Sequence, residues 1–329
     1  MNDPSNPRVS VVVPAYNVEP YVGAAIRSAL GQRAVSLEVI AVDDGSTDGT
    51  RAVLQHLAAA DPRLRVVFQG NQGPSGSRNA ALALARGAYV GFLDADDLWE
   101  PEKAARHIEL MDASPGIDIS YSWWRVIDEA GRETGRRATL PARRIPGGLT
   151  LAGLLIENFT GTLSTTFCRR EALSLVGGFD AGLRSNVDLD LLLRLAALRP
   201  GNVALVPEIL TSYRMRSGQI TKDWTRMRSN LEVVIRKAAQ RAPEQVAAVQ
   251  REAFARWTRY HAYVAYEAGD VAAARRLIRE AWTAHPASLA RDKRAWLTTA
   301  AILATHLPAK SHRVLAETVK SWRARKARA

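Results

Sequence analysis

The stretch Phe92-Leu93-Asp94-Ala95-Asp96-Asp97-Leu98-Trp99 places carboxylates directly after an apolar run, 88–93, that is typical of a buried β-strand. Asp94 and Asp96 stand two residues apart, where that strand ends. Mg²⁺ and Mn²⁺ prefer oxygen ligands and keep open positions for phosphate oxygens. The stretch is therefore a candidate site for a divalent metal that carries a diphosphate. The alternative is an acidic turn that caps a helix beginning near Pro101.

Three apolar runs upstream also end in polar clusters. The run that begins at Val9 stops at Pro14, and the run 38–42 leads into Asp43-Asp44-Gly45-Ser46-Thr47-Asp48. A third run, 64–68, leads into the glycine-rich loop 70–79. Helical spacing over 21–30 and 80–86 separates the runs, and this alternation predicts a doubly wound α/β sheet with parallel strands. Ligands of such sheets bind beyond the carboxyl ends of the strands, where all these clusters fall.

The glycine-rich loop matches neither a phosphate-binding loop ending in Gly-Lys-Ser/Thr nor the pattern Gly-x-Gly-x-x-Gly. Kinase and dehydrogenase functions therefore lose support.

In their order and spacing, these segments resemble glycosyltransferase family 2, the inverting, bacterial-type transferases of GT-A fold. The resemblance covers roughly residues 8–215 and rests on Val9–Asn17, Val42–Thr50, Gly73–Leu82, Ala88–Trp99, Val176-Gly177-Gly178-Phe179-Asp180 and Tyr213-Arg214. It implies a doubly wound mixed sheet and a metal-dependent enzyme. Such an enzyme moves a sugar from a nucleotide sugar to an acceptor hydroxyl.

The resemblance places the nucleotide sugar at the strand ends. Tyr16 would stack on the base, a role suited to a flat ring, although a core tyrosine is the alternative. Asp44 would accept from the imide N–H of uracil, which implies a UDP-sugar. Arg78 would lie near the phosphates, which a guanidinium can bind through its fixed fork of donors. The alternative is a surface pair of Arg78 with Asp44 or Asp94. The full predicted set is Pro14, Tyr16, Asn17, Asp44, Arg78, Asp94 and Asp96.

For the metal, the resemblance implies Mn²⁺ or Mg²⁺ at the Asp-x-Asp motif. Asp96 is expected to coordinate the metal directly, and Asp94 to bind the ribose or a water of the metal shell. The metal would neutralise charge on the departing nucleoside diphosphate. Asp97 is expected to cap the next helix.

The catalytic base is expected in the stretch 186–195, which opens an amphipathic helix. Asp188 falls on the family aspartate that removes the acceptor proton, whereas a first-turn carboxylate favoured by the helix dipole is the alternative. Asp190 and Arg194, at i and i+4, are expected to pair. Two positions depart from the family pattern: Val187 replaces the usual glutamate, and Arg216 stands where histidine is frequent.

The 329 residues predict four segments. They are a disordered N-terminus (1–7), a GT-A domain (8–216), an α-helical domain (217–306) and a basic amphipathic helix (307–329). The helical part includes one helix-turn-helix of tetratricopeptide type over 265–286. Tyr260, Tyr263 and Tyr266, at three-residue spacing, are expected in the core rather than on a sugar-binding surface. The apolar run 295–307 is shorter than the roughly 20 residues that span a bilayer, and it predicts a buried helix.

The net charge of +12 is concentrated near the C-terminus. The helix 307–329 would lie on an anionic membrane surface, or it would be a charged tail packed on the helical domain; both alternatives stay open. Cys168 is the only cysteine, which fits a reducing cytoplasm. We therefore expect a cytoplasmic protein, with peripheral contact at the inner face of the cell membrane as an option.

The expected function is the extension of a cell-surface glycan or lipid-linked acceptor, one sugar per encounter, because the Gln-x-x-Arg-Trp signature of processive members is missing. Loops near Trp123, Trp124 and 158–166 are expected to select the acceptor. Two alternatives remain: a basic nucleic-acid-binding protein, suggested by the charge alone, and a catalytically inactive sugar-nucleotide-binding relative, suggested by Val187 and Arg216. No recognised nucleic-acid-binding signature appears, so no nucleic-acid partner is expected.

Overall fold

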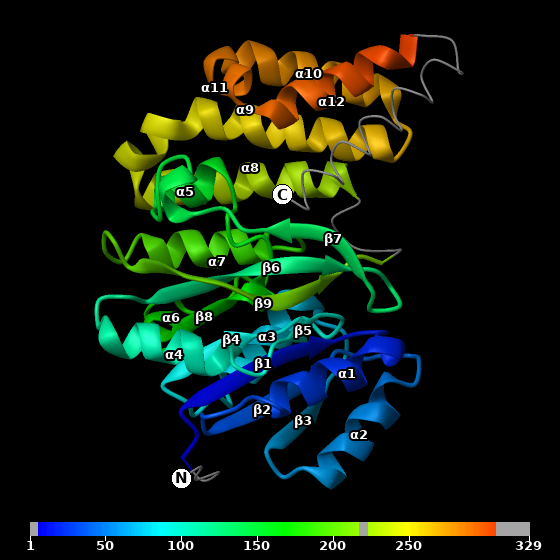
Figure 1. Ribbon diagram of the computed structural model, residues 1–329, viewed down its shortest axis with the longest axis vertical. Helices are drawn as coiled ribbons and strands as arrows, with labels where there is room; N and C mark the ends of the chain where they lie inside the picture. Colours follow the sequence, from blue (N-terminus) through cyan, green and yellow to red (C-terminus); the bar gives the residue numbers. More distant parts are fainter. Residues whose placement is uncertain (1–5, 217–222, 307–329) are drawn as a thin grey trace.

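The computed structural model describes residues 6–216 and 223–306. A mixed nine-stranded sheet lies between two layers of helices, and the C-terminal helices stack on one of these layers (Figure 1).

The strands are β1 (Val9–Ala15), β2 (Leu37–Asp43), β3 (Leu64–Phe68), β4 (Tyr89–Phe92), β5 (Leu98–Trp99), β6 (Ile119–Ile127), β7 (Glu133–Ala138), β8 (Thr166–Arg169) and β9 (Val203–Arg214). The α-helices are α1 (Glu19–Leu30), α2 (Thr50–Ala60), α3 (Gly73–Leu82), α4 (Lys103–Ala113), α5 (Leu151–Ile156), α6 (Arg170–Val176), α7 (Val187–Ala196), α8 (Trp224–Arg241), α9 (Pro243–Glu267), α10 (Val271–Ala284), α11 (Pro286–Arg291) and α12 (Lys293–Leu303). Short 3₁₀ turns are η1 (Ala142–Arg144), η2 (Leu163–Thr165) and η4 (Ala304–His306).

The first half of the sheet is the predicted parallel unit. Strands β3, β2, β1 and β4 lie side by side in that order, and every pair among them is parallel. The second half is mixed: β8 pairs antiparallel with both β4 and β6, and β6 pairs parallel with β9. The polar clusters after β1, β2 and β4 therefore meet at one edge of the sheet.

The central strands are mostly apolar because both of their faces are covered, and the buried exceptions Ser10 and Glu38 are joined by a hydrogen bond. In β1, Val9, Val11 and Val13 pack toward α1, α2 and α4, whereas Val12 packs on the opposite side with residues of β2, β4 and α7. Successive strand side chains point to opposite faces, so nearly every position of a strand that is buried on both faces favours an apolar residue.

Helix α3 differs from the prediction, which put a helix at 80–86 after a loop. It begins seven residues earlier, at Gly73, and ends at Leu82. Gly73 has φ +79°, a backbone conformation that glycine adopts readily. Pro74 follows in the first turn, where its fixed φ suits a helix start. Most of the glycine-rich stretch is thus the first part of the helix.

The C-terminal helices share a core with the sheet domain. Leu231 and Val234 of α8 and Val246 of α9 belong to the same apolar cluster as residues of α5 and α7. The predicted helix-turn-helix is confirmed as the end of α9 and α10, with the Asp270 side chain accepting from the Ala273 N–H at the start of α10. Among residues 6–216 and 223–306, no helix combines the length and apolarity needed to cross a membrane.

The four-segment division stays a prediction. The predicted helical domain begins at residue 217, and its first residues, 217–222, lie outside the described residues. The predicted amphipathic helix 307–329 and most of the predicted disordered N-terminus also lie outside them.

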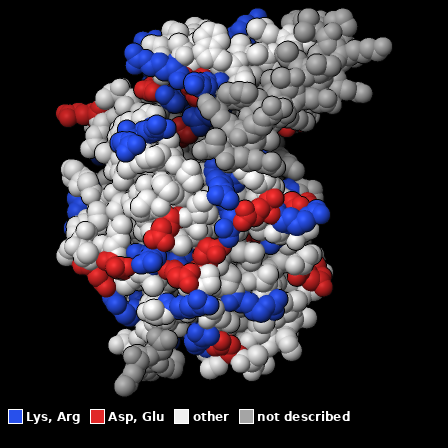
Figure 2. Space-filling view, in the orientation of Figure 1, with Lys and Arg blue, Asp and Glu red and all other residues white. Residues whose placement is uncertain are grey.

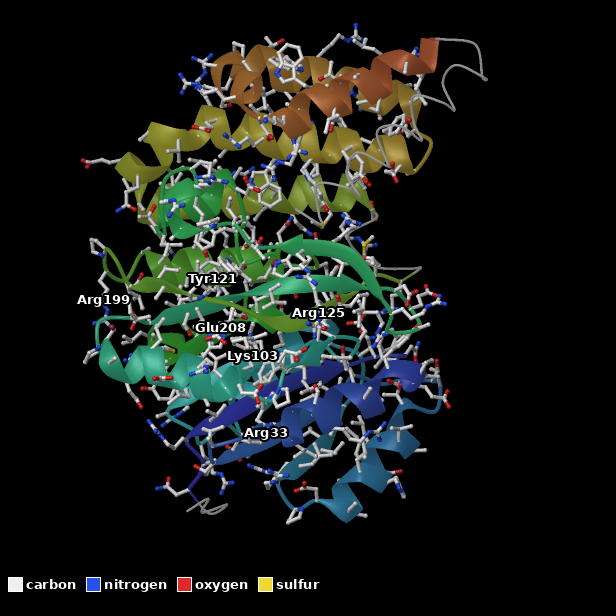
Figure 3. All side chains as sticks on the ribbon, in the orientation of Figure 1. Arg33, Lys103, Tyr121, Arg125, Arg199 and Glu208 are labelled. Atoms are coloured by element: carbon white, nitrogen blue, oxygen red, sulfur yellow. The ribbon has the colours of Figure 1, made fainter. Side chains whose placement is uncertain are left out.

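Lys103 and His107 form a buried polar pair between α4 and the sheet (Figure 3 labels Lys103). Lys103 Nζ lies 3.2 Å from His107 Nε2 and donates to the Thr165 carbonyl at 3.1 Å. His107 Nδ1 lies 2.7 Å from Ser120 Oγ. Burial lowers the pKa of both groups well below their usual values, and the nearby Lys103 lowers the pKa of His107 further.

We expect the free energy of unfolding to fall as the pH drops below 6.5, the ordinary pKa of histidine. In that range the unfolded chain binds a proton at His107 that the folded chain excludes. The lowered pKa of Lys103 has an effect of the same sign that begins at pH 10.5, the ordinary pKa of lysine. Each such group costs at most about 1.4 kcal/mol per pH unit. Denaturant titrations above and below this pH should show a flatter dependence for His107→Gln than for wild type. His56→Gln, at an exposed histidine, should behave as wild type; equal slopes for all three proteins would contradict the assignment.

Candidate functional site

The ends of β1 and β2 are joined by a side-chain network. Tyr16 is 48% exposed, so its ring is available for stacking on a ligand. Asn17 has φ +50°, and its Oδ1 accepts from the Thr47 N–H at 2.8 Å. Asp43 accepts from the Ser46 N–H, and Ser46 Oγ accepts from the Asn17 N–H. The network holds this part of the sheet edge in place around Tyr16. Pro14 lies two residues before Tyr16, in β1.

Asp44 is buried and anchors the start of α3. Its Oδ1 accepts from Gln69 Nε2 at 2.7 Å and from the Gln72 N–H at 2.9 Å, and its Oδ2 accepts from the Gly73 N–H at 2.8 Å. A carboxylate at a helix N-terminus satisfies free N–H groups and complements the helix dipole. Among the residues that the structure describes, Asp44 Oδ2 accepts only from the Gly73 N–H, and a carboxylate oxygen can accept two hydrogen bonds, so one acceptor position remains for the predicted contact with uracil.

Asp94 follows β4 and pairs with Arg78 of α3. Arg78 Nη2 donates to Asp94 Oδ1 at 2.5 Å, and Arg78 is only 7% exposed. Residues around η2 hold the other side of the aspartate: Thr162 Oγ1 donates to Asp94 Oδ2 at 3.3 Å, and Ser164 Oγ accepts from the Asp94 N–H at 3.0 Å. Sequence reasoning predicted both partners of the ion pair but neither hydroxyl group.

Asp96 lies beside the last described residues of the sheet domain. Arg216 Nε donates to Asp96 Oδ2 at 2.5 Å, and Arg214 Nε donates to the Asp96 carbonyl at 2.8 Å. Burial and then the charge of Asp94 raise the pKa of Asp96, whereas Arg216 opposes that shift. Arg216, which replaces a frequent family histidine, is therefore in direct contact with the predicted metal ligand.

The prediction that Asp97 caps the next helix is wrong. Asp97 is fully buried, and its Oδ1 accepts from the Arg214 N–H at 2.8 Å. Helix α4 begins at Lys103 with Glu102 at its N-cap. Asp97 instead joins the Asp-x-Asp turn to the end of β9, because the packing of β9 beside β5 brings these distant residues together.

Asp188 lies in the first turn of α7, as predicted, and is half-buried. Asn158 Nδ2 donates to Asp188 Oδ2 at 3.0 Å, and Thr160 Oγ1 donates to Asn158 Oδ1 at 2.7 Å. Burial raises the pKa of Asp188; the charge of Asp94 adds to this shift and that of Arg78 opposes it. A carboxylate with a raised pKa is a stronger base than an ordinary aspartate.

The Gly-Gly-Phe motif connects α3 with α7. Asn79 of α3 accepts from the Phe179 N–H and donates to the Phe179 carbonyl, both at 2.8 Å. A Cβ on Gly178 would lie 2.7 Å from Asn79 Oδ1, so this close approach requires glycine. Arg194 donates to the carbonyls of Val176 and Gly178 and pairs with Asp190 at 2.7 Å, which confirms the predicted i, i+4 pair.

A cavity of about 1000 Å³ brings together residues predicted to bind the nucleotide sugar and the residue predicted to be the base. Arg78, Asp94, Val187 and Asp188 line it, together with loop residues that include Trp124 and Asn158. The opposite wall comes from the C-terminal helices and includes Met227, Arg256, Trp257, Arg259, Tyr260, Tyr263, Arg294 and Leu297.

The core prediction for the tyrosines is thus wrong for Tyr260 and Tyr263, which line this cavity, and right for Tyr266, which packs on α10 and its neighbours. Helical spacing alone does not tell a face that meets a cavity from one that meets a packed core.

Asp94 and Asp96 fit a divalent cation. The charge of Asp94 raises the pKa of Asp96, so the two carboxylates are close enough to repel each other, and a cation would relieve that repulsion. Residues 6–216 and 223–306 contain no group of three or more His, Cys, Asp or Glu arranged around a metal-sized site. Two carboxylates leave coordination positions for the oxygens of a diphosphate.

Known proteins resemble this chain in sequence. The model for glycosyl transferase family 2 matches residues 10–177. The succinoglycan biosynthesis protein ExoO of Rhizobium meliloti (strain 1021) is 35% identical over 224 residues, which are 66% of this chain and 63% of ExoO. The chain thus spans somewhat less than two thirds of that relative.

Solved structures also share the fold. The mannosyltransferase PcManGT from Pyrobaculum calidifontis, in complex with GDP-Man and Mn²⁺, has a TM-score of 0.61 at 20% identity, covering 100% of this chain and 89% of that one. S. aureus TarS 1-349, in complex with UDP, has a TM-score of 0.55 at 20% identity, covering 77% of this chain and 80% of that one. Because the family model matches more than half of the chain and these folds agree, the protein belongs to glycosyltransferase family 2 and has a GT-A fold.

Proposed function

We propose that this protein transfers a sugar, with inversion, from a UDP-sugar to a hydroxyl of a glycan or lipid-linked acceptor in the synthesis of a cell-surface polysaccharide. The observation that carries the proposal is the single cavity shared by Arg78 and Asp94 on the donor side and by Asp188 on the acceptor side. The name of the relative ExoO, a succinoglycan biosynthesis protein, supports the polysaccharide.

In this mechanism Asp188 takes the proton of the acceptor hydroxyl. The hydroxyl oxygen forms a bond to the anomeric carbon as the bond from that carbon to the diphosphate breaks, and the electron pair leaves with the nucleoside diphosphate. Asn158 holds Asp188 through its hydrogen bond to Oδ2. No covalent glycosyl-enzyme is required, because one base and one displacement are enough.

On the donor side, Arg78 and Arg216 would supply positive charge near the phosphates, and Tyr16 would stack on the base. Asp96, with Asp94, would hold Mn²⁺ or Mg²⁺, which supplies charge neutralisation for the leaving diphosphate when bound. PcManGT was solved with GDP-Man and TarS with UDP, so the fold is compatible with either nucleotide. We propose UDP rather than GDP because Asp44 is predicted to accept from the imide N–H of uracil.

The membrane contact proposed for 307–329 would bring the enzyme to a lipid-linked acceptor. Lys and Arg side chains elsewhere are interspersed with Asp and Glu on the face drawn in Figure 2. Such a mixed surface gives the nucleic-acid alternative no continuous basic track on that face.

Thermal stability with UDP and with UDP-, GDP- and dTDP-sugars, each with Mn²⁺ and with EDTA, tests the proposal. A ligand at about 100 times its dissociation constant stabilises by about 2.7 kcal/mol. For a chain of this length, this corresponds to an increase in Tm of roughly 4 °C, because the entropy of unfolding is about 2.1 cal/mol/K per residue. We expect the increase with a uridine nucleotide and Mn²⁺, and its loss in EDTA. An equal increase in EDTA would remove the metal from the proposal, and no increase with any nucleotide would overturn the function.

A further inference from the structure

Arg259 of α9 is a buried cation on the wall of the cavity, and neither the proposed donor site nor the base uses it. It is 9% exposed. Its guanidinium forms no hydrogen bond or ion pair with any residue in the described ranges 6–216 and 223–306, and its Nε is buried without a partner. An arginine almost removed from water normally has a partner, since an unpaired buried charge is costly. A ligand in the cavity would provide one.

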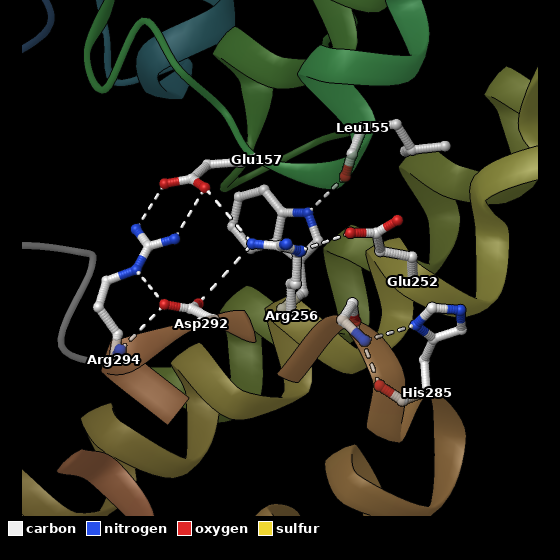
Figure 4. A network of polar contacts seen from close by, with 9 residues as sticks. Leu155, Glu157, Glu252, Arg256, His285, Asp292 and Arg294 are labelled. Atoms are coloured by element: carbon white, nitrogen blue, oxygen red, sulfur yellow. Dashed lines mark hydrogen bonds and ion pairs between the residues drawn. The ribbon is translucent and has the colours of Figure 1, made fainter. Parts of the chain in front are cut away.

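The charges of Glu157 and Asp292 act on Arg259, and both acids interact with two other arginines, Arg256 and Arg294 (Figure 4). Arg294 donates to both carboxylate oxygens of Glu157, at 2.5 and 2.8 Å, and its Nε donates to Asp292 at 3.1 Å. Arg256 donates to Glu252 at 2.9 Å and lies 3.9 and 3.7 Å from Glu157 and Asp292. Glu157 and Asp292 attract Arg259 electrostatically, and Asp292 Oδ2 is buried without a hydrogen-bond partner. Within the described residues, however, neither acid forms a hydrogen bond or an ion pair with Arg259.

The net charge of the cavity wall is positive, like that of Arg259. In its described part the wall carries seven arginines against four acidic residues, Asp94, Glu157, Asp188 and Glu267. Burial, followed by the charge of Arg294, lowers the pKa of Arg259 to about 10, so the group remains charged at neutral pH. A cavity of this size with excess positive charge favours a ligand that carries negative charge.

The position of Arg259 points to the acceptor rather than to the nucleotide. It comes from the C-terminal helices, between Trp257 and Tyr260, whose rings also line the cavity. Trp257 is held by a hydrogen bond from its Nε1 to the Leu155 carbonyl at 2.8 Å. Burial raises the pKa of Tyr260, and the charge of Asp188 adds a smaller rise, so this part of α9 lies within electrostatic reach of the proposed base. Aromatic faces beside a guanidinium suit a sugar ring that bears an anionic group.

We propose that Arg259 binds an oxyanion on the acceptor, so that the acceptor is an anionic glycan whose sugar carries a carboxylate or a phosphate. The inference rests on the proposed function, because it assumes that the cavity receives the acceptor. A guanidinium can bind either oxyanion through two parallel hydrogen bonds. In the absence of the ligand, the same charge is a cost to the folded protein.

The test measures binding of three small probes to the full chain in the presence of UDP and Mn²⁺. The probes are methyl β-glucuronide (a carboxylate), glucose 1-phosphate (a phosphate) and methyl β-glucoside (neutral). We expect wild type to bind one of the anionic probes at least about tenfold more tightly than the neutral probe, which is about 1.4 kcal/mol. Whichever anionic probe binds identifies the oxyanion.

Variants separate this role from a structural one. Arg259→Met keeps most of the buried stem and should lose the preference for the anionic probe, with unchanged UDP binding and a Tm equal to or above that of wild type. Arg259→Lys should retain part of the preference. Arg276→Met removes the same charge from an exposed site on α10 outside the cavity wall, and it should behave as wild type.

Each contrary result is decisive. If UDP binds but no anionic probe is preferred, the inference fails and the proposed function stands. If the preference survives in Arg259→Met, or if that variant loses stability while Arg259→Lys does not restore the preference, Arg259 is structural. If an anionic probe binds through Arg259 but no nucleotide binds, the anion site stands and the proposed function fails.

Discussion

Replacing Asp188 by asparagine is expected to slow sugar transfer by about two to four orders of magnitude while donor binding stays unchanged. The asparagine keeps the shape of the side chain and an oxygen that can accept from Asn158, but it cannot take a proton. A positioned general base contributes about 10²–10⁴-fold to the rate, so transfer should fall by that factor. The measurement is the rate of UDP release from the nucleotide sugar that stabilises the protein most, with and without an acceptor glycan.

The control is Asp270→Asn, the same chemical change at the N-cap of α10, where asparagine caps as well as aspartate. It should leave both the transfer rate and the Tm near those of wild type. Because burial raises the pKa of Asp188, transfer by wild type should decline on the acid side at a higher pH than an ordinary aspartate would give. Transfer at the wild-type rate in Asp188→Asn would dispose of its role as the base.

Asp96→Asn is expected to remove the metal-dependent part of donor binding. The change takes away one of the two carboxylates that would hold the metal and leaves Arg216 without the acidic partner it has at 2.5 Å. If UDP affinity falls about a hundredfold, a concentration that stabilises wild type by about 2.7 kcal/mol stabilises the variant by only about 0.4 kcal/mol. The measurement is the increase in Tm with UDP and Mn²⁺, compared with the increase in EDTA.

Asp270→Asn again serves as the matched change, and Asp188→Asn adds a second comparison, since it should keep the Mn²⁺-dependent increase that Asp96→Asn loses. A Mn²⁺-dependent increase of wild-type size in Asp96→Asn would remove this residue from the metal site. If UDP raises the Tm of both wild type and Asp96→Asn equally with Mn²⁺ and with EDTA, Arg78 and Arg216 alone neutralise the diphosphate.

Some of the site could be predicted because it depends on local order along the chain. Each polar cluster directly follows an apolar strand, and parallel neighbouring strands bring their carboxyl ends to one edge. Tyr16, Asp94 and Asp96 needed no further information to be placed there. The pair Asp190–Arg194 was predictable for a similar reason, because residues four apart on a helix lie on one face.

Other parts could not be predicted, because they depend on which faces pack together. Asp97 meets Arg214, 117 residues away, only because β5 lies beside β9. Asp44 caps α3 because that helix begins within what the sequence indicates is a loop. Tyr260 and Tyr263 have the spacing of core residues, and only the cavity beside α9 shows that they do not fill a core.

The sequence by itself determined the parallel α/β half of the sheet, the order of its motifs and the edge at which the acidic residues gather, because strand periodicity and strand ends are local properties. The tertiary structure decided that Arg78 pairs with Asp94 rather than with Asp44 and that Asn158 holds Asp188. It also decided that α9 brings into the same cavity an arginine with no hydrogen bond or ion pair to any described residue. Those contacts join segments far apart in the chain, and their geometry follows from how the helices pack on the sheet and on one another.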